Sequence, residues 1–216
     1  MKKTLLIVTL VIVSISLFLF TYNYKSEQEH SFYTYKLSKL DKTKLKDGDI
    51  ILRYGYGLVS DLIVETLKPK YNISHCGIVR RIDSTNFKII HSVSSTISNF
   101  DGVQEQSLES FINDSRHNSV IVVRYKCKND SLLSKISNRA QFYLDKKVPF
   151  DNLFEINDSS KIYCSELLWI IIKDEFNDDI FKNSYNKKKD YFKFDLFLDT
   201  SKFEIILNHQ LLKKAN

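Results

Sequence analysis

An unbroken apolar run near the N-terminus constrains this chain most strongly. Residues 4–22 are apolar or small and hydroxylic, with Lys2 and Lys3 in front and a polar segment behind. About nineteen such residues match the thickness of a bilayer core, so we expect a transmembrane helix. A cleaved signal peptide usually has a shorter apolar region and small residues at its exit, whereas this run ends in Phe20, Thr21 and Tyr22. The lysines in front predict a cytoplasmic N-terminus and an extracytoplasmic remainder.

The rest of the composition predicts one globular domain. Of the 216 residues 43% are hydrophobic, and there are only five glycines and two prolines. This apolar content suffices for one core, and so few glycines and prolines exclude a linker-rich or disordered chain. We therefore expect a membrane anchor or uncleaved signal over 1–24, a charged tether over 25–45 and a folded domain over 46–216.

Charge and cysteine content exclude several functions. The formal net charge is +6, with no arginine-rich stripe and no nucleic-acid motif, so nucleic acid is not an expected partner. Cys76, Cys127 and Cys164 form neither CxxC pairs nor the His/Cys spacing of a zinc site. We expect no metal, no cofactor and no disulfide framework, with Cys76 and Cys127 either buried or paired with each other.

The pattern of turns and apolar residues predicts alternating strands and helices. A turn over 46–49 precedes a strand over 50–53, and the apolar spacing over 58–68 predicts a helix that Pro69 ends. Further strands are expected over 102–106, 120–125 and 203–207. Further helices are expected over 107–113 and, capped by Ser131, up to residue 146.

Two strand-like runs, 74–81 and 87–93, predict a β-hairpin around the turn residues 83–86. The register decides which side chains share a face, because a slip of one residue turns every side chain over. We expect paired positions whose numbers sum to an even number. His75 and His91 then lie on one face, within reach of each other.

Cys164 lies where the longest apolar run of the folded domain begins. Residues 167, 168 and 170–172 are apolar with no Gly or Pro among them, which places Cys164 in the first turn of a buried helix. Free backbone N–H groups and the helix dipole at such an end favour thiolate over thiol. A cysteine in an apolar neighbourhood is also a common packing residue, and this interpretation stands beside the reactive one.

Cleavage of an acyl bond by a thiol needs three groups. These are a nucleophile at a helix start, an imidazole that takes its proton, and a polar residue that orients the imidazole. Cys164, His75 and His91 supply residues of these three types from separate parts of the chain.

Five short motifs occur in an order that resembles the permuted papain-like amidases, the YiiX/YebB-like branch of the NlpC/P60 superfamily. They occupy residues 46–53, 74–79, 89–93, 150–154 and 163–167. The resemblance covers roughly residues 46–207. It implies an α+β, circularly permuted papain-like fold, with an antiparallel sheet or partial barrel packed against helices. The histidine precedes the cysteine, as in the permuted branch.

By this resemblance Cys164 is the nucleophile, His75 the general base and acid, and His91 the third polar residue. Members of the family commonly carry Glu at the third position, so His91 is a departure. Asp49 and Tyr54 match positions near the rim of the active site. Tyr163, which precedes the nucleophile, is expected to line the substrate cleft; a turn role for Asp49 and a core role for Tyr163 are equally open.

We expect a single-pass protein of the bacterial cytoplasmic membrane whose extracytoplasmic domain is a cysteine amidase or peptidase. The resemblance implies cleavage of an amide through an acyl-enzyme, with peptides of the cell wall as substrates. One alternative is an acyl-lipid hydrolase or acyltransferase of the same superfamily. The other is a non-catalytic wall-binding module. A long apolar groove at Cys164 favours lipid, whereas a polar cleft favours peptide.

Overall fold

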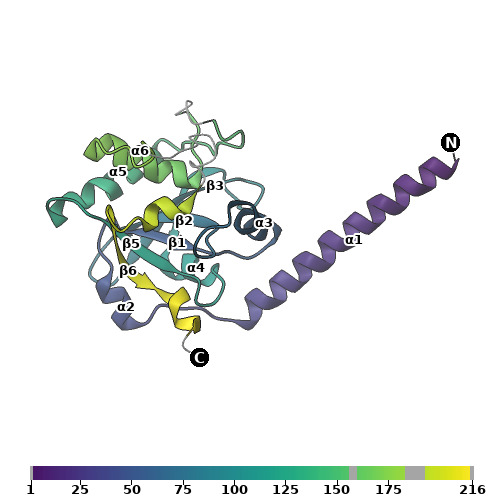
Figure 1. The fold of residues 1–216 in the computed structure, drawn as a ribbon, viewed down its shortest axis with the longest axis horizontal. Helices are drawn as coiled ribbons and strands as arrows, with labels where there is room; N and C mark the ends of the chain where they lie inside the picture. The colour runs from purple at the N-terminus through teal and green to yellow at the C-terminus, as the bar shows by residue number, and fades with distance from the viewer. Residues whose placement is uncertain (1, 156–159, 183–192, 215–216) are drawn as a thin grey trace.

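The computed structural model describes residues 2–155, 160–182 and 193–214. A long helix, α1 (Lys2–Phe32), extends from a folded domain that contains all the strands (Figure 1). The helix continues past residue 24, so the first part of the predicted tether is helical. Within the described residues, α1 is the one helix long and apolar enough to cross a membrane, and a signal sequence near the N-terminus has the same character.

The domain is built on one antiparallel sheet of six strands in the order β4-β3-β2-β1-β5-β6. Each pair of neighbours is antiparallel. The sheet packs against helices, which confirms the predicted fold class. The strands are β1 (Ile50–Arg53), β2 (His75–Arg81), β3 (Phe87–Val93), β4 (Gly102–Ser107), β5 (Ile121–Tyr125) and β6 (Phe203–Asn208).

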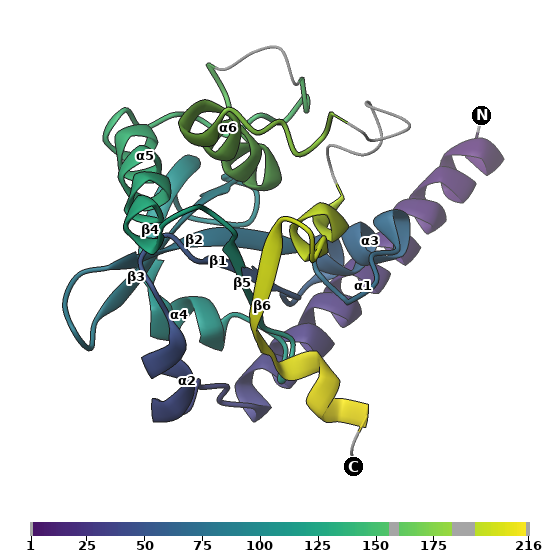
Figure 2. The ribbon, with the colours of Figure 1, turned by 60° about the vertical axis from the view of Figure 1, so that its left-hand side comes forward.

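Helices cover both faces of this sheet (Figure 2). One face carries α5 (Ser134–Asp145) and α6 (Cys164–Phe176), and the other carries α2 (Lys39–Lys44) and α4 (Leu108–Asn113). The helix α3 (Leu58–Leu67) follows β1 and lies near α1. The remaining described elements are short 3₁₀ turns, η1 (Asp130–Leu132), η2 (Phe194–Leu198) and η3 (His209–Lys214).

The core forms two apolar layers because successive side chains of a strand point to opposite faces. Ile50, Leu52 and Ile78 pack toward α5 and α6. Ile51 and Val79, which alternate with them, pack toward α4. A residue on β2 is therefore assigned to a layer by its position in the strand.

One helix start differs from its prediction. Ser131 was expected to cap the helix that ends near residue 146, but it lies inside η1, and α5 begins at Ser134. The side chain of Asn129 accepts a hydrogen bond from the backbone N–H of Ser131 at 3.0 Å. Asn129 thus caps a 3₁₀ turn first, and the α-helix starts after it.

Candidate active site

The β2–β3 hairpin brings two histidines into contact. Ile78 pairs with Ile90 and Val79 with Ile89, an even-sum register that puts His75 and His91 on one face, as predicted. His75 Nε2 lies 2.8 Å from His91 Nδ1. Gly77 lies on β2 next to His91 of β3. A Cβ added at Gly77 would lie 3.2 Å from the Cβ of His91 and 2.5 Å from a methyl group of Ile89. Glycine therefore makes room for His91 against β2.

An arginine and a phenylalanine enclose this pair. Arg53, the last residue of β1, lies directly opposite His75. Its guanidinium stacks over the Phe111 ring at 4.2 Å and donates a hydrogen bond to the Phe111 carbonyl at 2.8 Å. The same ring lies 5.9 Å from His75 and 5.6 Å from His91, centroid to centroid. Phe111 thus holds the cation and both imidazoles in one cluster.

Burial and the Arg53 charge keep both imidazoles neutral. Burial, and next the positive charge of Arg53, lowers the pKa of His75 well below its ordinary value. The same two causes lower the pKa of His91 to about 3, against a small opposing effect of Gln106. At pH 7 the His75 imidazole is therefore neutral, which is the form that can accept a proton.

The contact between the rings determines which tautomer serves as a base. If His75 Nε2–H donates to His91 Nδ1, then His75 Nδ1 is free to accept a proton, and His91 carries its own proton on Nε2. His91 Nε2 is buried, and among the described residues no hydrogen bond of ordinary geometry reaches it, although the Gln106 side chain raises the pKa of His91. The contact with His91 Nδ1 fixes one nitrogen of the His75 ring.

Cys164 is the first residue of α6, as predicted. Tyr163 before it has extended backbone, and its N–H donates to the Glu166 carboxylate at 3.2 Å. Glu166 thereby caps the helix start, while Leu167, Leu168 and the residues beyond them bury the helix in the core. Cys164 itself is half-buried and has a free thiol.

The surroundings of Cys164 favour its thiolate. A hydrogen bond from the Cys76 thiol, with further ones from the backbone N–H groups of Ser165 and Cys76, lowers the pKa of Cys164 against the opposing effect of burial. Burial raises the pKa of Cys76, which remains a thiol and can donate. The helix start thus supplies the N–H groups expected from the sequence, and Cys76 adds a donor.

Cys164 and the histidines reach one end of the sheet from opposite faces. Cys76 points toward α6, whereas His75, one residue earlier on β2, points toward Phe111 of α4. Burial lowers the pKa of Arg53, the residue opposite His75, and the negative charges of Asp114 and of a Cys164 thiolate oppose this shift. The structure therefore brings His75 and His91 together, and it places Cys164 against Cys76, the residue that follows His75.

Asp49, an expected rim residue, lies elsewhere. It precedes β1, at the opposite end of that strand from Arg53, and it is fully buried. Its carboxylate oxygens accept from Arg124 at 2.7 and 2.8 Å, and one also accepts from the backbone N–H of Lys46 at 2.7 Å. These contacts make Asp49 an anchor of the turn before β1, and the structure does not bring it to the histidine pair.

The two expected tyrosines have different environments. Tyr54 follows Arg53, but its hydroxyl donates to Asp61, and its ring lies 4.7 Å from the Arg116 guanidinium, next to a cavity of about 380 Å³. Tyr163 is buried, and its ring lies 5.4 Å from that of Phe154. Tyr163 therefore adjoins the nucleophile candidate, whereas Tyr54 belongs to the contact with α3.

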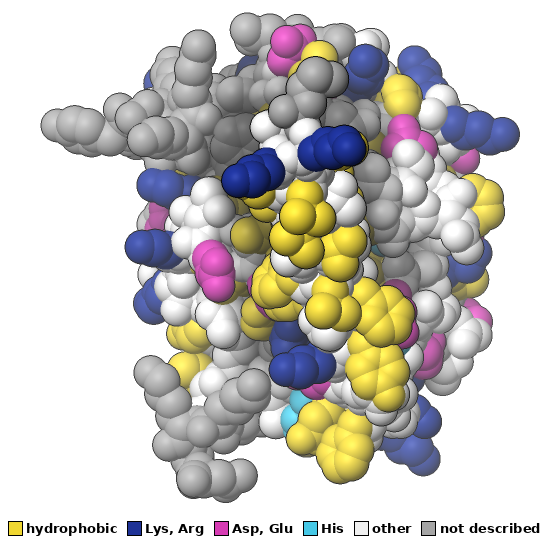
Figure 3. Space-filling view, turned by 90° about the vertical axis from the view of Figure 1, so that its right-hand side faces the viewer, with side chains coloured by type: hydrophobic (Ala, Val, Ile, Leu, Met, Phe, Trp, Pro, Cys, Tyr) yellow, Lys and Arg dark blue, Asp and Glu magenta, His cyan; other side chains and the backbone are white. Residues whose placement is uncertain are grey.

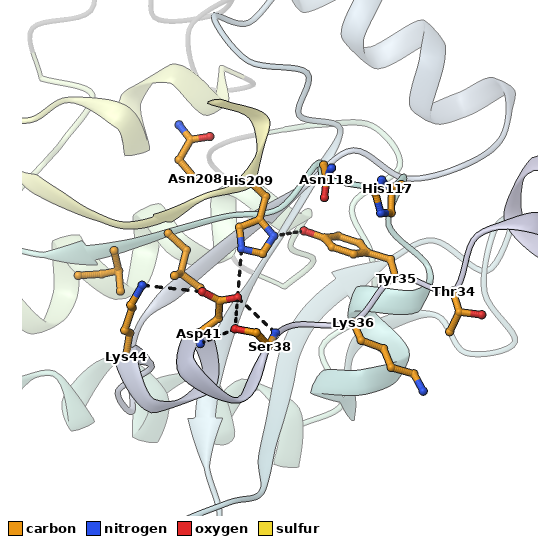
Figure 4. Close-up of a pocket in the computed structure, with 12 residues that line it drawn as sticks. Thr34, Tyr35, Lys36, Ser38, Asp41, Lys44, His117, Asn118, Asn208 and His209 are labelled. Atoms are coloured by element: carbon orange, nitrogen blue, oxygen red, sulfur yellow. Dashed lines mark hydrogen bonds and ion pairs between the residues drawn. The ribbon is translucent and has the colours of Figure 1, made fainter. Parts of the chain in front are cut away.

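A second polar cluster lies apart from these residues. Tyr35, His209 and Asp41 form a hydrogen-bonded chain in a cavity of about 490 Å³ (Figure 4). It joins the segment after α1 to η3. Burial raises the pKa of the Tyr35 hydroxyl, which is therefore neutral and a poor nucleophile. This cavity contains none of the predicted catalytic residues.

Two of three comparisons with known proteins find matches for the chain. Residues 44–198 match the family described as permuted papain-like amidase enzymes, YaeF/YiiX, C92 family. The crystal structure of metalloprotein yiiX from Escherichia coli O157:H7 matches with a TM-score of 0.58 and 16% identity, over 76% of this chain and 98% of that one. No curated protein matches. The family match covers most of the chain, which thus belongs to the C92 permuted papain-like amidases and is a cysteine peptidase- or amidase-type hydrolase.

Proposed function

We propose that this chain is a membrane-anchored, extracytoplasmic thiol hydrolase that cleaves an amide bond, with Cys164 as nucleophile, His75 as general base and acid, and His91 as the orienting residue. The observation that carries the proposal is the 2.8 Å contact between the half-buried His75 imidazole and the buried His91 imidazole, together with a cysteine of lowered pKa at the start of a helix that packs against the same strand. Thiol acyl transfer requires a thiolate nucleophile and an imidazole base that a further polar group orients.

The proposed reaction uses His75 twice. Its Nδ1 takes the proton of Cys164, the thiolate attacks the amide carbonyl carbon, and the C–N bond breaks as the imidazolium protonates the leaving amine. Water, deprotonated by His75, then hydrolyses the thioester. The backbone N–H of Cys164 is the proposed oxyanion donor. Proton transfer requires the His75 imidazole to approach the Cys164 sulfur when substrate binds.

Two substrate classes have support. The family name, amidase and peptidase, supports a peptide amide, and the proposed extracytoplasmic location makes a cell-wall peptide one such substrate. Large apolar side chains exposed beside Tyr163 favour a second candidate, an amide that carries an acyl chain. A non-catalytic binding module would have no need of a lowered cysteine pKa, which counts against that alternative.

The Escherichia coli protein yiiX is described as a metalloprotein. Among the described residues of this chain, no group of three or more His, Cys, Asp or Glu side chains is placed to hold a metal ion. The imidazole pair also offers few free nitrogens, because one nitrogen of each ring is used in their mutual contact. No step of the proposed reaction is therefore assigned to a metal.

Membrane anchoring rests on α1. Its apolar residues are exposed from Leu5 to Phe20, which suits a lipid environment and is costly in water. Mass spectrometry of the N-terminus of the membrane-bound protein separates an uncleaved anchor from a removed signal. An intact N-terminal segment is expected, and loss of residues 1–24 would contradict the anchor.

Hydrolysis assays with matched variants test the proposed reaction. The full chain in detergent is offered peptide amides and N-acyl amines, and product release is followed for Cys164→Ser, His75→Asn and the control Cys127→Ser. Both site variants are expected to lose roughly 10²- to 10⁴-fold or more in kcat/KM. Cys127, away from the histidine pair, is expected to be dispensable. Activity retained by Cys164→Ser would refute the assignment.

A further inference from the structure

Four large apolar side chains are exposed on two loops near the start of α6. Ile97 and Phe100 lie on the loop between β3 and β4, and Leu153 and Phe154 on the loop that precedes α6. Their exposed fractions lie between 45% and 71%. Single exposed hydrophobic residues are ordinary, but a group of four large ones marks an interaction surface. We call these four residues the apolar rim.

Hydrogen bonds hold the two loops side by side. Ser94 Oγ donates to Asn152 Oδ1 at 3.0 Å, and the backbone N–H of Phe150 donates to Asp101 at 3.2 Å. At the base of the loops, the Val103 N–H donates to the Val148 carbonyl at 2.8 Å. Contacts at both ends of the β3–β4 loop thus hold the two loops that carry the apolar rim next to each other.

The apolar rim adjoins the proposed nucleophile. The Phe154 ring lies 5.4 Å from the ring of Tyr163, the residue before Cys164. Ser92, one residue after His91, donates from Oγ to the Ile162 carbonyl at 2.5 Å, which fixes the same chain segment to β3. A molecule bound to the rim therefore contacts the two segments that carry Cys164 and His91.

The chain also holds its membrane-spanning candidate firmly against the domain. The Tyr22 hydroxyl of α1 donates to Asp61 of α3, and the Gly57 N–H donates to Ser26 Oγ at 2.8 Å. Tyr22 ends the apolar run, so α3 lies at the expected bilayer surface. Two further apolar residues of α3, Val59 and Leu62, are exposed there.

The loop before α6, which carries two residues of the apolar rim, lies on the side of the domain toward which the N-terminal end of α1 extends. In Figures 1 and 2 the N-terminal end of α1 and the loop before α6 both lie at the top of the molecule. Viewed from the side of α1, apolar side chains cover much of the helix, and basic side chains lie at its N-terminal end (Figure 3). The apolar part of α1 and the loop before α6 therefore lie toward the same side of the domain.

We propose that the apolar rim lies in the surface of the bilayer that α1 spans and binds the acyl chain of a membrane amphiphile, so that the amide cleaved at Cys164 joins a fatty acyl group to an amine. This rests on the proposed function, whose nucleophile it uses. The Cys164 thiolate attacks the acyl carbonyl, the C–N bond breaks, and the amine leaves with the proton from His75. Water then releases a fatty acid and restores the thiolate.

Quenching of tryptophan fluorescence by brominated lipids tests the contact with the bilayer. The full chain is reconstituted into phosphatidylcholine–phosphatidylglycerol vesicles with acyl chains that carry bromine, as Leu153→Trp and as the control Ile82→Trp. Ile82 is similarly exposed but lies in the turn at the far end of β2 from His75. The wild-type chain supplies the baseline of the buried Trp169.

We expect brominated lipids to quench the fluorescence of the added tryptophan at position 153 at least twofold. The quenching measured with tryptophan at position 82 should match the wild-type baseline. Equal quenching at the two positions would overturn the proposal. A second measurement compares hydrolysis of hexadecanoyl and butanoyl amides by Leu153→Asp, which should lower kcat/KM at least tenfold more for the long chain. An equal effect on both would also contradict the proposal. Quenching needs no active Cys164, so failure of the catalytic assignment is distinguishable from failure of the rim.

Discussion

Replacing Asp49 with Asn should strongly destabilise the domain without acting on the substrate. The Asp49 carboxylate is fully buried and bonds Arg124 through both oxygens, at 2.7 and 2.8 Å. The Arg124 side chain is only 11% exposed, so it keeps little water when its partner is neutralised. Removing one partner of a buried ion pair costs about 3–5 kcal/mol. For a domain of this size that is a fall of roughly 6–20 °C in Tm.

Urea unfolding of the full chain in detergent, followed by Trp169 fluorescence, measures this loss. Glu105→Gln is the matched control, because Glu105 pairs with Lys88 on the surface, where both side chains are partly exposed, and should cost less than about 1 kcal/mol. An Asp49→Asn loss within about 1 kcal/mol of the control would refute the structural role. So would a stable Asp49→Asn variant with a raised KM, since that result is expected of a substrate-binding carboxylate at the rim.

Three further predictions concern the site. Arg53→Met should move the acid limb of the kcat/KM profile to higher pH. The Arg53 charge lowers the pKa of His75, so without that charge the neutral base form of His75 requires a higher pH. Arg53→Lys keeps the charge and should stay near wild type. Cys76→Ala should move the midpoint of Cys164 alkylation to higher pH, since the Cys76 thiol is the main cause of the lowered Cys164 pKa. His91→Asn keeps an acceptor near His75 Nε2 and should retain more activity than His91→Leu, for which a loss of roughly 10²-fold in kcat is expected. Unchanged profiles in the first two cases, or equal activities in the third, would contradict these roles.

The parts of the site that depend on local pattern were predictable. Alternation along two β-strands is enough to put His75 and His91 on one face once the register is chosen. The apolar run after Cys164 is likewise enough to place the cysteine at a helix start, and Glu166 at the third helical position caps that helix. Each of these features depends on residues that are close in sequence or joined by one hairpin.

The parts of the site that depend on residues distant in sequence could not be predicted from local pattern. Asp49 has the sequence context of a turn residue or a rim residue, and its burial follows from Arg124, 75 positions away. Arg53 ends an ordinary strand, and only the pairing of β1 with β2 puts it opposite His75. Cys76 contacts Cys164 because alternation turns it away from His75 and toward α6, which packs there through tertiary contacts. Strand alternation carried a signal for Cys76, but no local pattern indicated the Arg53 and Phe111 contacts.

The most direct test of Cys164 as the activated nucleophile is the site of thiol alkylation near neutral pH. The full chain is treated with limiting iodoacetamide at about pH 6.5, below the ordinary pKa of a free thiol, and each cysteine is quantified by peptide mass spectrometry. Cys164 is expected to react first, ahead of Cys127, which is also half-buried, while the buried Cys76 remains unmodified. Equal labelling of Cys164 and Cys127, or faster labelling of Cys127, would contradict an activated Cys164.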